Sequence, residues 1–320
     1  VATAASMDGY SSAGASMTRG GFKKTVPCRA PRAILADLDV LAAAPPEMSA
    51  WGYGDLAGKV PAGGDWIIAD ALGAEAIDDV AWPLVQDNLA GWLAAPDAVR
   101  AGDAAAMADL FAGLTLSGLA MEFYGTSRPA SGADHQIAHM WEMESLAFGG
   151  ERVSHGACVA VGAMASQRLF DWVLSQDLTG IDVDALVEKA PTLAVKQTEI
   201  ERSMAAEIVP QAMGEVAAKH LEGAELRARL ERLRSAWPSL SARLTSHMMR
   251  APRLAELLRA AGAPVFPEDI GLDDGRLVET VRVARFVRAR YTILDLLEEC
   301  GLLDLALDSA LARHERSGER

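Results

Sequence analysis

The chain has 320 residues, of which 44 are acidic and 30 are basic, giving a net charge of −14. This acidic balance argues against a nucleic-acid partner, because phosphate neutralisation requires a basic face. No apolar run reaches the roughly 18 uncharged residues of a membrane span, so we expect none. The three cysteines are isolated and form no CxxC motif, which favours a reducing, cytoplasmic location.

The first 80 residues mix strand, turn and helix signals. Glycines 20–21 between two extended runs predict a hairpin, and the apolar run 32–40 predicts a buried strand. A helix is expected to begin at 47–50, to be interrupted by the glycine-rich stretch 51–59, and to resume at 65–72. We interpret residues 1–80 as an incomplete α/β nucleotide-binding domain, since several βαβ units would not fit within them.

Beyond residue 80 the apolar residues recur at helical spacing, which predicts an all-helical domain over 81–320. The expected helical stretches are 79–94, 104–124, 135–148, 159–176, 183–188, 196–230 with a break at Pro210, 240–250, 253–260, and 276–313 with a break at Gly301. The predicted fold class is therefore α/β followed by all-α.

The stretch 127–143 carries the strongest chemical signal. It opens with turn residues and continues into a helix, for which Ser131 or Asp134 is the expected N-cap. His135 and His139 are four residues apart and so share one helical face, and His155 follows after a Gly-Gly turn.

Neutral imidazoles together with one carboxylate are typical ligands of a catalytic divalent metal. Asp55, flanked by glycines in the stretch 52–55, is the most distinctive carboxylate outside the histidine window. Spacing alone does not choose between His135 and His139 as the ligand. The remaining histidines are interpreted as surface residues: His220, His247 and His314.

Several motifs occur together in one order along the chain. They are Thr-Ala-Ala-Ser-Met-Asp-Gly at 3–9 with Ser12, Ala-Asp-Leu-Asp-Val at 36–40, Gly-Tyr-Gly-Asp-Leu at 52–56, Ser-Arg-Pro-Ala-Ser-Gly-Ala-Asp-His at 127–135, His155-Gly156, and Arg-Tyr-Thr-Ile-Leu-Asp-Leu at 290–296. In this combination the chain resembles the sn-glycerol-1-phosphate dehydrogenase family, including its bacterial branch, within the dehydroquinate-synthase-like and iron-containing alcohol dehydrogenase superfamily.

The resemblance implies a fold in which the C-terminal part of a Rossmann-like nucleotide domain precedes a helical metal-binding domain. It implies metal ligation by Asp55, His135 and His155, and substrate contacts by His139 and Asp8, with Asp55 also touching the substrate. It assigns NAD(P) binding to Thr3, Ala4, Ala5, Ser6 and Ser12. The expected metal is a single divalent ion, with zinc preferred over nickel or iron.

The implied reaction interconverts dihydroxyacetone phosphate and sn-glycerol 1-phosphate, with a small phosphorylated substrate as partner and a homodimer as the assembly. We expect Asp55 and His139 to be catalytic, and His139 either to transfer a proton or only to position substrate. Lys59, one helical turn after Asp55, is expected to pair with Asp55 rather than with phosphate.

The family's glycine-rich dinucleotide loop, GGxxxD, has no counterpart in these residues, so we expect the N-terminus to be truncated. The alternative is a true loss of cofactor binding. Two other functions stay open at this point: a related polyol or alcohol dehydrogenase acting on an unphosphorylated substrate, and a non-catalytic metal-binding fragment.

Overall fold

A computed structural model of the chain describes residues 1–11, 14–19 and 22–311. The N-terminal elements are η1 (Gly9–Ser11), β1 (Gly14–Arg19), β2 (Phe22–Pro27), α1 (Leu38–Ala42), α2 (Pro46–Ala57) and α3 (Lys59–Ala71). The hairpin predicted around glycines 20–21 is confirmed, because β1 and β2 pair antiparallel.

The predicted strand at 32–40 is wrong. Within the described part of the chain this segment forms one parallel bridge, between Ala2 and Ala36, and then enters α1. The side chain of Asp37 accepts a hydrogen bond from the backbone of Asp39 and so starts that helix. A buried parallel strand needs neighbours along its length, and Leu35 is instead 63% exposed.

The middle of the chain is helical. Its elements are α4 (Ala81–Val85), α5 (Leu89–Trp92), α6 (Pro96–Arg100), α7 (Ala104–Tyr124), η2 (Arg128–Ala130), α8 (Ala133–Met143), β3 (Ala147–Phe148), β4 (Glu151–Arg152) and α9 (His155–Val173). The predicted bounds of α7 are confirmed. The helix predicted over 135–148 instead ends at Met143, because a hairpin of two short strands, β3 and β4, follows it.

The C-terminal part is also helical. Its elements are η3 (Leu178–Gly180), α10 (Val183–Lys189), α11 (Leu193–Ser203), α12 (Val209–Lys219), α13 (Gly223–His247), α14 (Ala251–Ala261), η4 (Pro267–Ile270), α15 (Asp274–Ala284), α16 (Ile293–Glu299), α17 (Leu303–Ala306) and the π-helical turn η5 (Leu307–Leu311). The break at Gly301 is confirmed, with a left-handed φ of 64°.

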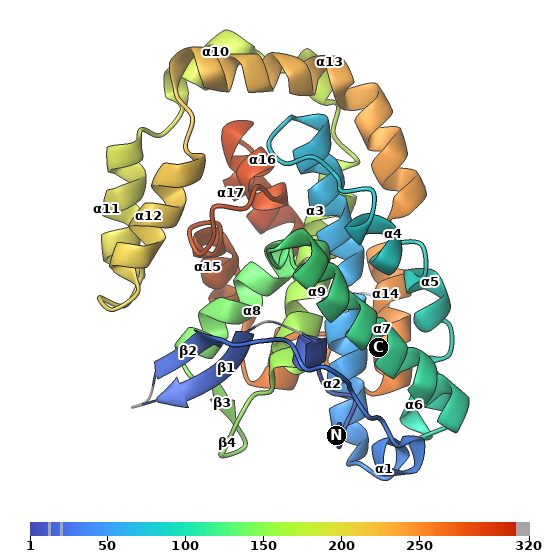
Figure 1. The fold of residues 1–320 in the computed structure, drawn as a ribbon. Coiled ribbons are helices and arrows are strands. Elements are labelled where there is room, and N and C mark those ends of the chain that lie inside the picture. Colours follow the sequence, from blue (N-terminus) through green and yellow to red (C-terminus); the bar gives the residue numbers. More distant parts are fainter. Residues whose placement is uncertain (12–13, 20–21, 312–320) are drawn as a thin grey trace.

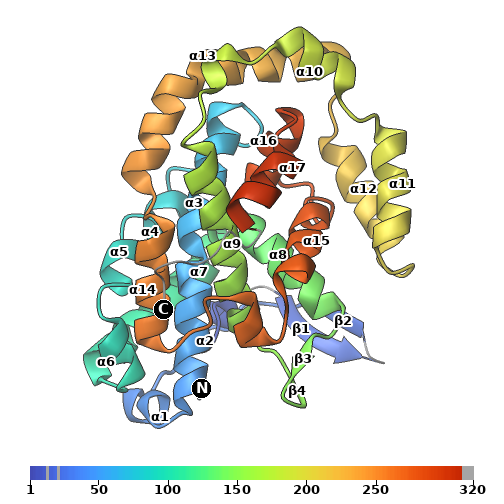
Figure 2. The same cartoon turned by 180° about the vertical axis from the view of Figure 1, so that it is seen from behind.

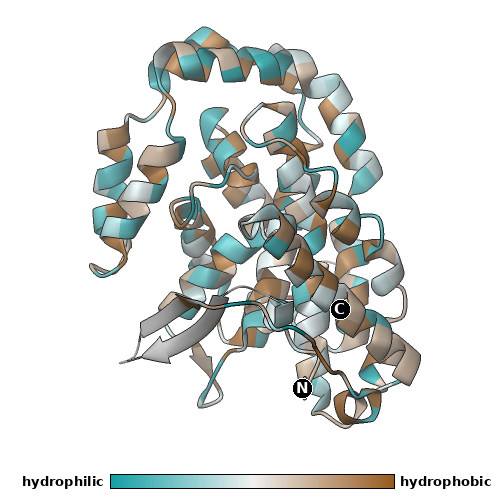
Figure 3. Cartoon of the chain, in the orientation of Figure 1, coloured by the Kyte–Doolittle hydropathy of each residue, from teal (hydrophilic) through white to brown (hydrophobic). Residues whose placement is uncertain are grey.

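Helices α2 and α3 follow one another end to end through the centre of the molecule, and α7, α8 and α9 pack against them (Figure 1). α13 arches over one end and leads down to α14, while α11 and α12 form a separate pair on the other side (Figures 1 and 2). Hydrophilic residues are frequent on α13 and on this pair, and apolar residues dominate α7 (Figure 3). The predicted division into two domains near residue 80 stays a prediction.

α7 is long and apolar enough to cross a membrane by length and composition alone. Half of its most apolar window is buried inside the molecule, and Leu110 and Leu114 are fully buried in the core. Core helices of this kind pass the same test.

The glycine-rich stretch 51–59 does not interrupt α2, contrary to the prediction. A Cβ on Gly54 would lie 2.7 Å from the carbonyl oxygen of Gly156, and one on Gly156 would lie 2.0 Å from that of Trp51. The glycines therefore let α2 and α9 touch backbone to backbone. This contact brings the end of α2 against the start of α9.

Candidate metal centre

Three side chains from three helices meet where α2, α8 and α9 come together. Asp55, near the end of α2, is fully buried. His135 lies in the first turns of α8, and His155 is the first residue of α9, directly after its N-cap Ser154. Their ligand atoms lie within 4.8 Å of one another.

A carboxylate stands behind each of the two imidazoles. Asp134 Oδ2 lies 2.5 Å from His135 Nδ1, and Glu142 Oε1 lies 2.6 Å from His155 Nδ1. A carboxylate accepts hydrogen bonds, so each Nδ1 donates, and in the neutral form of each ring the lone pair is on Nε2. This carboxylate–histidine arrangement is the one that orients metal-ligating histidines in proteins.

The donor set fits a divalent metal. His135 Nε2 lies 3.4 Å from Asp55 Oδ1, and two ligands about 2.05 Å from a tetrahedral zinc lie about 3.3 Å apart. Two imidazole nitrogens and one carboxylate oxygen leave coordination positions for water or substrate. The same ligands also suit nickel.

Charge in the site is balanced by a buried lysine. Lys59 Nζ lies 2.7 Å from Asp55 Oδ1 and 2.7 Å from Asp8 Oδ2, and its side chain has no exposed surface. Burial alone would raise the pKa of Asp55, but Lys59 and the hydrogen bond from His135 hold it far below its usual range. The predicted pairing of Lys59 with Asp55 is confirmed.

Burial and the neighbouring Asp134 carboxylate shift the pKa of His135 in opposite directions. Burial favours the neutral imidazole, but the adjacent Asp134 carboxylate outweighs it and raises the pKa of His135 to about 9. A metal must therefore displace a proton from this ring when it binds.

The start of α8 is fixed from a distant part of the chain. The prediction that Ser131 or Asp134 is the N-cap of α8 is wrong. Gly132 occupies the N-cap position. Asp65 Oδ2 accepts a hydrogen bond of 2.7 Å from the backbone of Ala133, and its Oδ1 accepts one of 2.6 Å from that of Ile293. A single buried carboxylate of α3 thus holds the first turns of both α8 and α16.

The chain is similar in sequence to known dehydrogenases. The family model described as iron-containing alcohol dehydrogenase matches residues 1–45. Glycerol-1-phosphate dehydrogenase of Bacillus subtilis (strain 168) is 31% identical over 297 residues, covering 93% of this chain and 62% of the relative. The enzyme of the same name from Geobacillus thermodenitrificans is 30% identical over 309 residues, covering 95% and 66%.

The chain is related to the glycerol-1-phosphate dehydrogenases. The predicted resemblance is thereby confirmed, and the chain spans less than two thirds of the length of these relatives. An archaeal alcohol dehydrogenase from a Red Sea brine pool aligns with a TM-score of 0.47 and 15% identity, covering 95% of this chain and 62% of that one.

Two further residues predicted to contact substrate in a glycerol-1-phosphate dehydrogenase lie beside the cluster. His139 is one turn after His135 on α8, with ring centroids 6.0 Å apart, and its side chain is 29% exposed. Burial lowers the pKa of His139 to about 4, against the opposing hydrogen bond to Glu142. The backbone N–H of Asp8 donates to Asp55 Oδ2 at 2.9 Å, so Asp8 adjoins the cluster as well.

The segment predicted to bind the cofactor runs along the same end of α2. Thr3 is exposed and Ser6 half-buried, whereas Ala4 and Ala5 are buried. A Cβ on Gly52 would lie 1.9 Å from the carbonyl oxygen of Ala5, so the segment packs directly on α2. Cofactor binding by these residues stays a prediction, and Ser12 lies outside the described residues.

Glu142, Asp134 and Asp65 are the residues of the site that sequence reasoning missed. Glu142 follows His139 by three residues and Asp134 precedes His135, so their closeness to the histidines was visible. Nothing in the sequence signalled that Glu142 would reach His155 across a hairpin.

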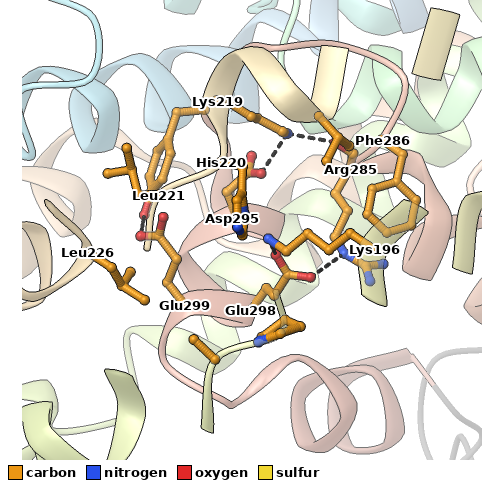
Figure 4. A pocket seen from close by; sticks show the side chains of 14 residues that line it. Lys196, Lys219, His220, Leu221, Leu226, Arg285, Phe286, Asp295, Glu298 and Glu299 are labelled. Carbon is orange, nitrogen blue, oxygen red and sulfur yellow. Dashed lines mark hydrogen bonds and ion pairs between the residues drawn. The ribbon is translucent and has the colours of Figure 1, made fainter. Parts of the chain in front are cut away.

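A separate, small pocket lies between α11–α12 and α16 (Figure 4). Lys219 pairs with Asp295 at 2.5 Å, and Arg285 pairs with Glu298 at 2.8 Å, so carboxylates already neutralise these cations. His220 lines this pocket with a side chain only 7% exposed. The interpretation of His220 as a surface residue is therefore wrong; it is the C-cap of α12, and its Nε2 lies 2.7 Å from Glu222 Oε1. His314 lies outside the described residues.

Proposed function

We propose that this chain forms the metal- and substrate-binding part of a metal-dependent, NAD(P)-linked oxidoreductase that interconverts dihydroxyacetone phosphate and sn-glycerol 1-phosphate. The observation that carries the proposal is the convergence of Asp55, His135 and His155 at one point, with His139 and Asp8 beside them. The relatives named for this reaction support the choice of substrate.

Asp55, His135 and His155 would hold the divalent ion, with zinc expected ahead of nickel or iron. The bound metal supplies Lewis-acid polarisation of the substrate oxygen, and NAD(P) supplies or accepts the hydride. The chain itself supplies the binding and orienting groups around these two.

Other residues of the chain position the candidate ligands, keep Asp55 charged and contact the substrate. Asp134 and Glu142 hold the imidazoles of His135 and His155 by their Nδ1 atoms. Lys59 fixes the Asp55 carboxylate and keeps it charged. His139, whose Nδ1 faces Glu142 Oε2 at 2.9 Å, keeps its Nε2 available to exchange a proton with the substrate hydroxyl or to position it.

The metal site is tested first, on this chain, by elemental analysis. We expect zinc or nickel in the unmodified protein and almost none after His135→Ala, because one of the three protein ligands is lost. His220→Ala, which removes an imidazole from the separate pocket, serves as the control and should keep its metal. Equal metal content in both variants would refute the assignment.

The substrate is tested by following the absorbance of NADH and NADPH, which falls when dihydroxyacetone phosphate is reduced and rises when NAD+ or NADP+ oxidises an alcohol. Dihydroxyacetone phosphate should be reduced, and glycerol and simple alcohols should not be oxidised at comparable rates. Activity confined to unphosphorylated polyols would instead identify a polyol dehydrogenase.

The proposal also includes a homodimeric assembly and a cytoplasmic location. Light scattering of the purified protein tests whether it is a dimer.

A further inference from the structure

Glu142 lies between two histidines and contacts both with different oxygens. Its Oε1 is 2.6 Å from His155 Nδ1, and its Oε2 is 2.9 Å from His139 Nδ1. The rings of His139 and His155 are nearly parallel, at 21°, with centroids 5.8 Å apart. One carboxylate therefore joins a predicted metal ligand to the predicted substrate residue.

Glu142 makes this contact between the end of one helix and the start of another. It lies in the last turn of α8, and His155 begins α9 after the β3–β4 hairpin. The Glu142 side chain is only 9% exposed. It thus connects the end of one helix to the start of the next inside the molecule.

The distances identify Glu142 as a hydrogen-bond acceptor rather than a metal ligand. Two atoms bound to one metal at about 2.05 Å are about 2.9 to 3.3 Å apart in octahedral or tetrahedral geometry. The Glu142–His155 separation of 2.6 Å is shorter than this and matches a charge-assisted hydrogen bond.

A charged carboxylate accepts at both oxygens, so both histidines must carry their proton on Nδ1. This fixes the tautomer of each ring and leaves each Nε2 with its lone pair. It also limits how far each ring can turn, because both rings are hydrogen-bonded to the same carboxylate.

We propose that Glu142 is the positioning residue of the site, setting the tautomer and orientation of His155 for the metal and of His139 for the substrate with one carboxylate. This inference rests on the proposed metal site of Asp55, His135 and His155. It assigns to α8 three roles along its length, with a metal ligand at the start, a substrate residue in the middle and the positioning carboxylate at the end.

The test compares Glu142→Gln with Glu144→Gln. Glu144 is the C-cap of the same helix and forms a surface ion pair with Arg276, so its variant is a matched control for removing an acidic group there. The Kd for Zn²⁺ is measured on this chain by competition with a chromophoric chelator, which requires neither cofactor nor substrate.

An amide can accept from one histidine but presents an NH₂ group to the other. We therefore expect Glu142→Gln to raise the Kd for Zn²⁺ by about 10- to 100-fold, the usual effect of losing such a partner. Glu144→Gln should change it by less than about twofold, because an exposed ion pair contributes little. Glu142→Asp keeps the charge on a shorter side chain and should recover part of the affinity.

Two further readouts separate positioning from a general loss of structure. Nitrogen-15 NMR of the histidine rings should show the Nδ1–H tautomer for His139 and His155 in the unmodified chain and a changed pattern in Glu142→Gln. The absorption spectrum of the Co²⁺-loaded chain should shift in Glu142→Gln and not in Glu144→Gln. If Glu142→Gln fails to fold, the Glu142→Asp spectrum and Kd decide the question.

The outcomes are distinguishable. An unmodified chain that binds no metal refutes the proposed function. An unmodified chain that binds one metal, with Glu142→Gln binding it equally well and with the same tautomers, refutes only the role of Glu142. A stoichiometry that falls from two metals to one in Glu142→Gln would show that Glu142 is itself a ligand and would also overturn the inference.

Discussion

Buried charged side chains at the centre of this molecule lie in contact with side chains of opposite charge. Lys59 meets both Asp55 and Asp8, and His135 meets Asp134. A buried charge without a partner costs several kcal/mol, and a paired one costs far less. Each polar residue of the site is therefore held in place by at least one other, which gives the ligands fixed positions.

A histidine outside the proposed metal cluster should make the stability of the fold depend on pH. His247 ends α13 and lies with its ring centroid 5.2 Å from that of Trp82. Burial, and then the charge of Arg243, lower the pKa of His247 below its usual value of about 6.5. Its unfolded form therefore binds a proton at a higher pH than its folded form.

The free energy of unfolding should consequently fall as the pH drops below about 6.5, because the unfolded chain gains the proton first. Urea denaturation at pH 7.5 and pH 5.5, in the presence of a chelator, measures the change. His247→Gln removes the group and should show a smaller decline than the unmodified chain. An identical decline in the two proteins would contradict the assignment.

Local spacing in the sequence pointed to candidate ligands, but it did not reveal the carboxylates that contact them. His135, His139 and His155 fall within one short window, so their pattern was readable. The carboxylate of Asp65 reaches Ile293, 228 residues away, and no local rule predicts such a contact. The role of Glu142 likewise depends on a hairpin that places α9 against α8.

At the scale of helices, the contact between α2 and α9 determines where Asp55 lies relative to His155. The glycines of 51–59 were interpreted as helix breakers because glycine has low helix propensity. In the fold, Gly54 and Gly156 are instead the points of closest approach. The prediction of a helix break at 51–59 was wrong because tertiary packing outweighed the low helix propensity of glycine.

Gly156→Ala tests this contact. In an isolated helix the change would stabilise by about 1 kcal/mol, but here the new Cβ would lie 2.0 Å from the carbonyl oxygen of Trp51. We expect destabilisation by about 1–3 kcal/mol and weaker metal binding, because His155 is the neighbouring residue. Chemical denaturation and the Kd for Zn²⁺ measure the two effects.

Gly214→Ala is the matched control. Gly214 lies within α12, and nothing lies within 4 Å of a Cβ placed there. This variant should be stabilised by about 0.5–1 kcal/mol with unchanged metal affinity. A stable Gly156→Ala protein with normal metal binding would show that the close approach of α2 and α9 is not required.

Across the whole molecule, one buried cation ties together segments that are distant in sequence. Arg128 has no exposed side-chain surface. It donates to the carbonyl oxygens of Tyr291 at 2.9 Å and Asp65 at 2.7 Å, joining η2 to α3 and to the segment before α16. The resemblance included Arg128 within its motif, but a structural role for it could not be predicted, since both acceptors are backbone atoms.

Arg128→Met should lower the free energy of unfolding by roughly 2–5 kcal/mol, because two buried carbonyl groups lose their donor. Arg243→Met is the control; it removes a half-exposed ion pair with Asp70 and should cost less than about 1 kcal/mol. Thermal and urea denaturation of both variants measure the difference. Equal losses would mean that Arg128 does not hold these segments together.

The ammonium of Lys59 has a consequence for how a cell would maintain this protein. It gives the carboxylates of Asp55 and Asp8 a countercharge that is covalently part of the chain. We therefore expect folding not to require a bound metal ion, in contrast to small domains that unfold without zinc. We expect metal depletion to inactivate such a protein while leaving it folded, so that the folded protein can bind its ion again when metal is restored.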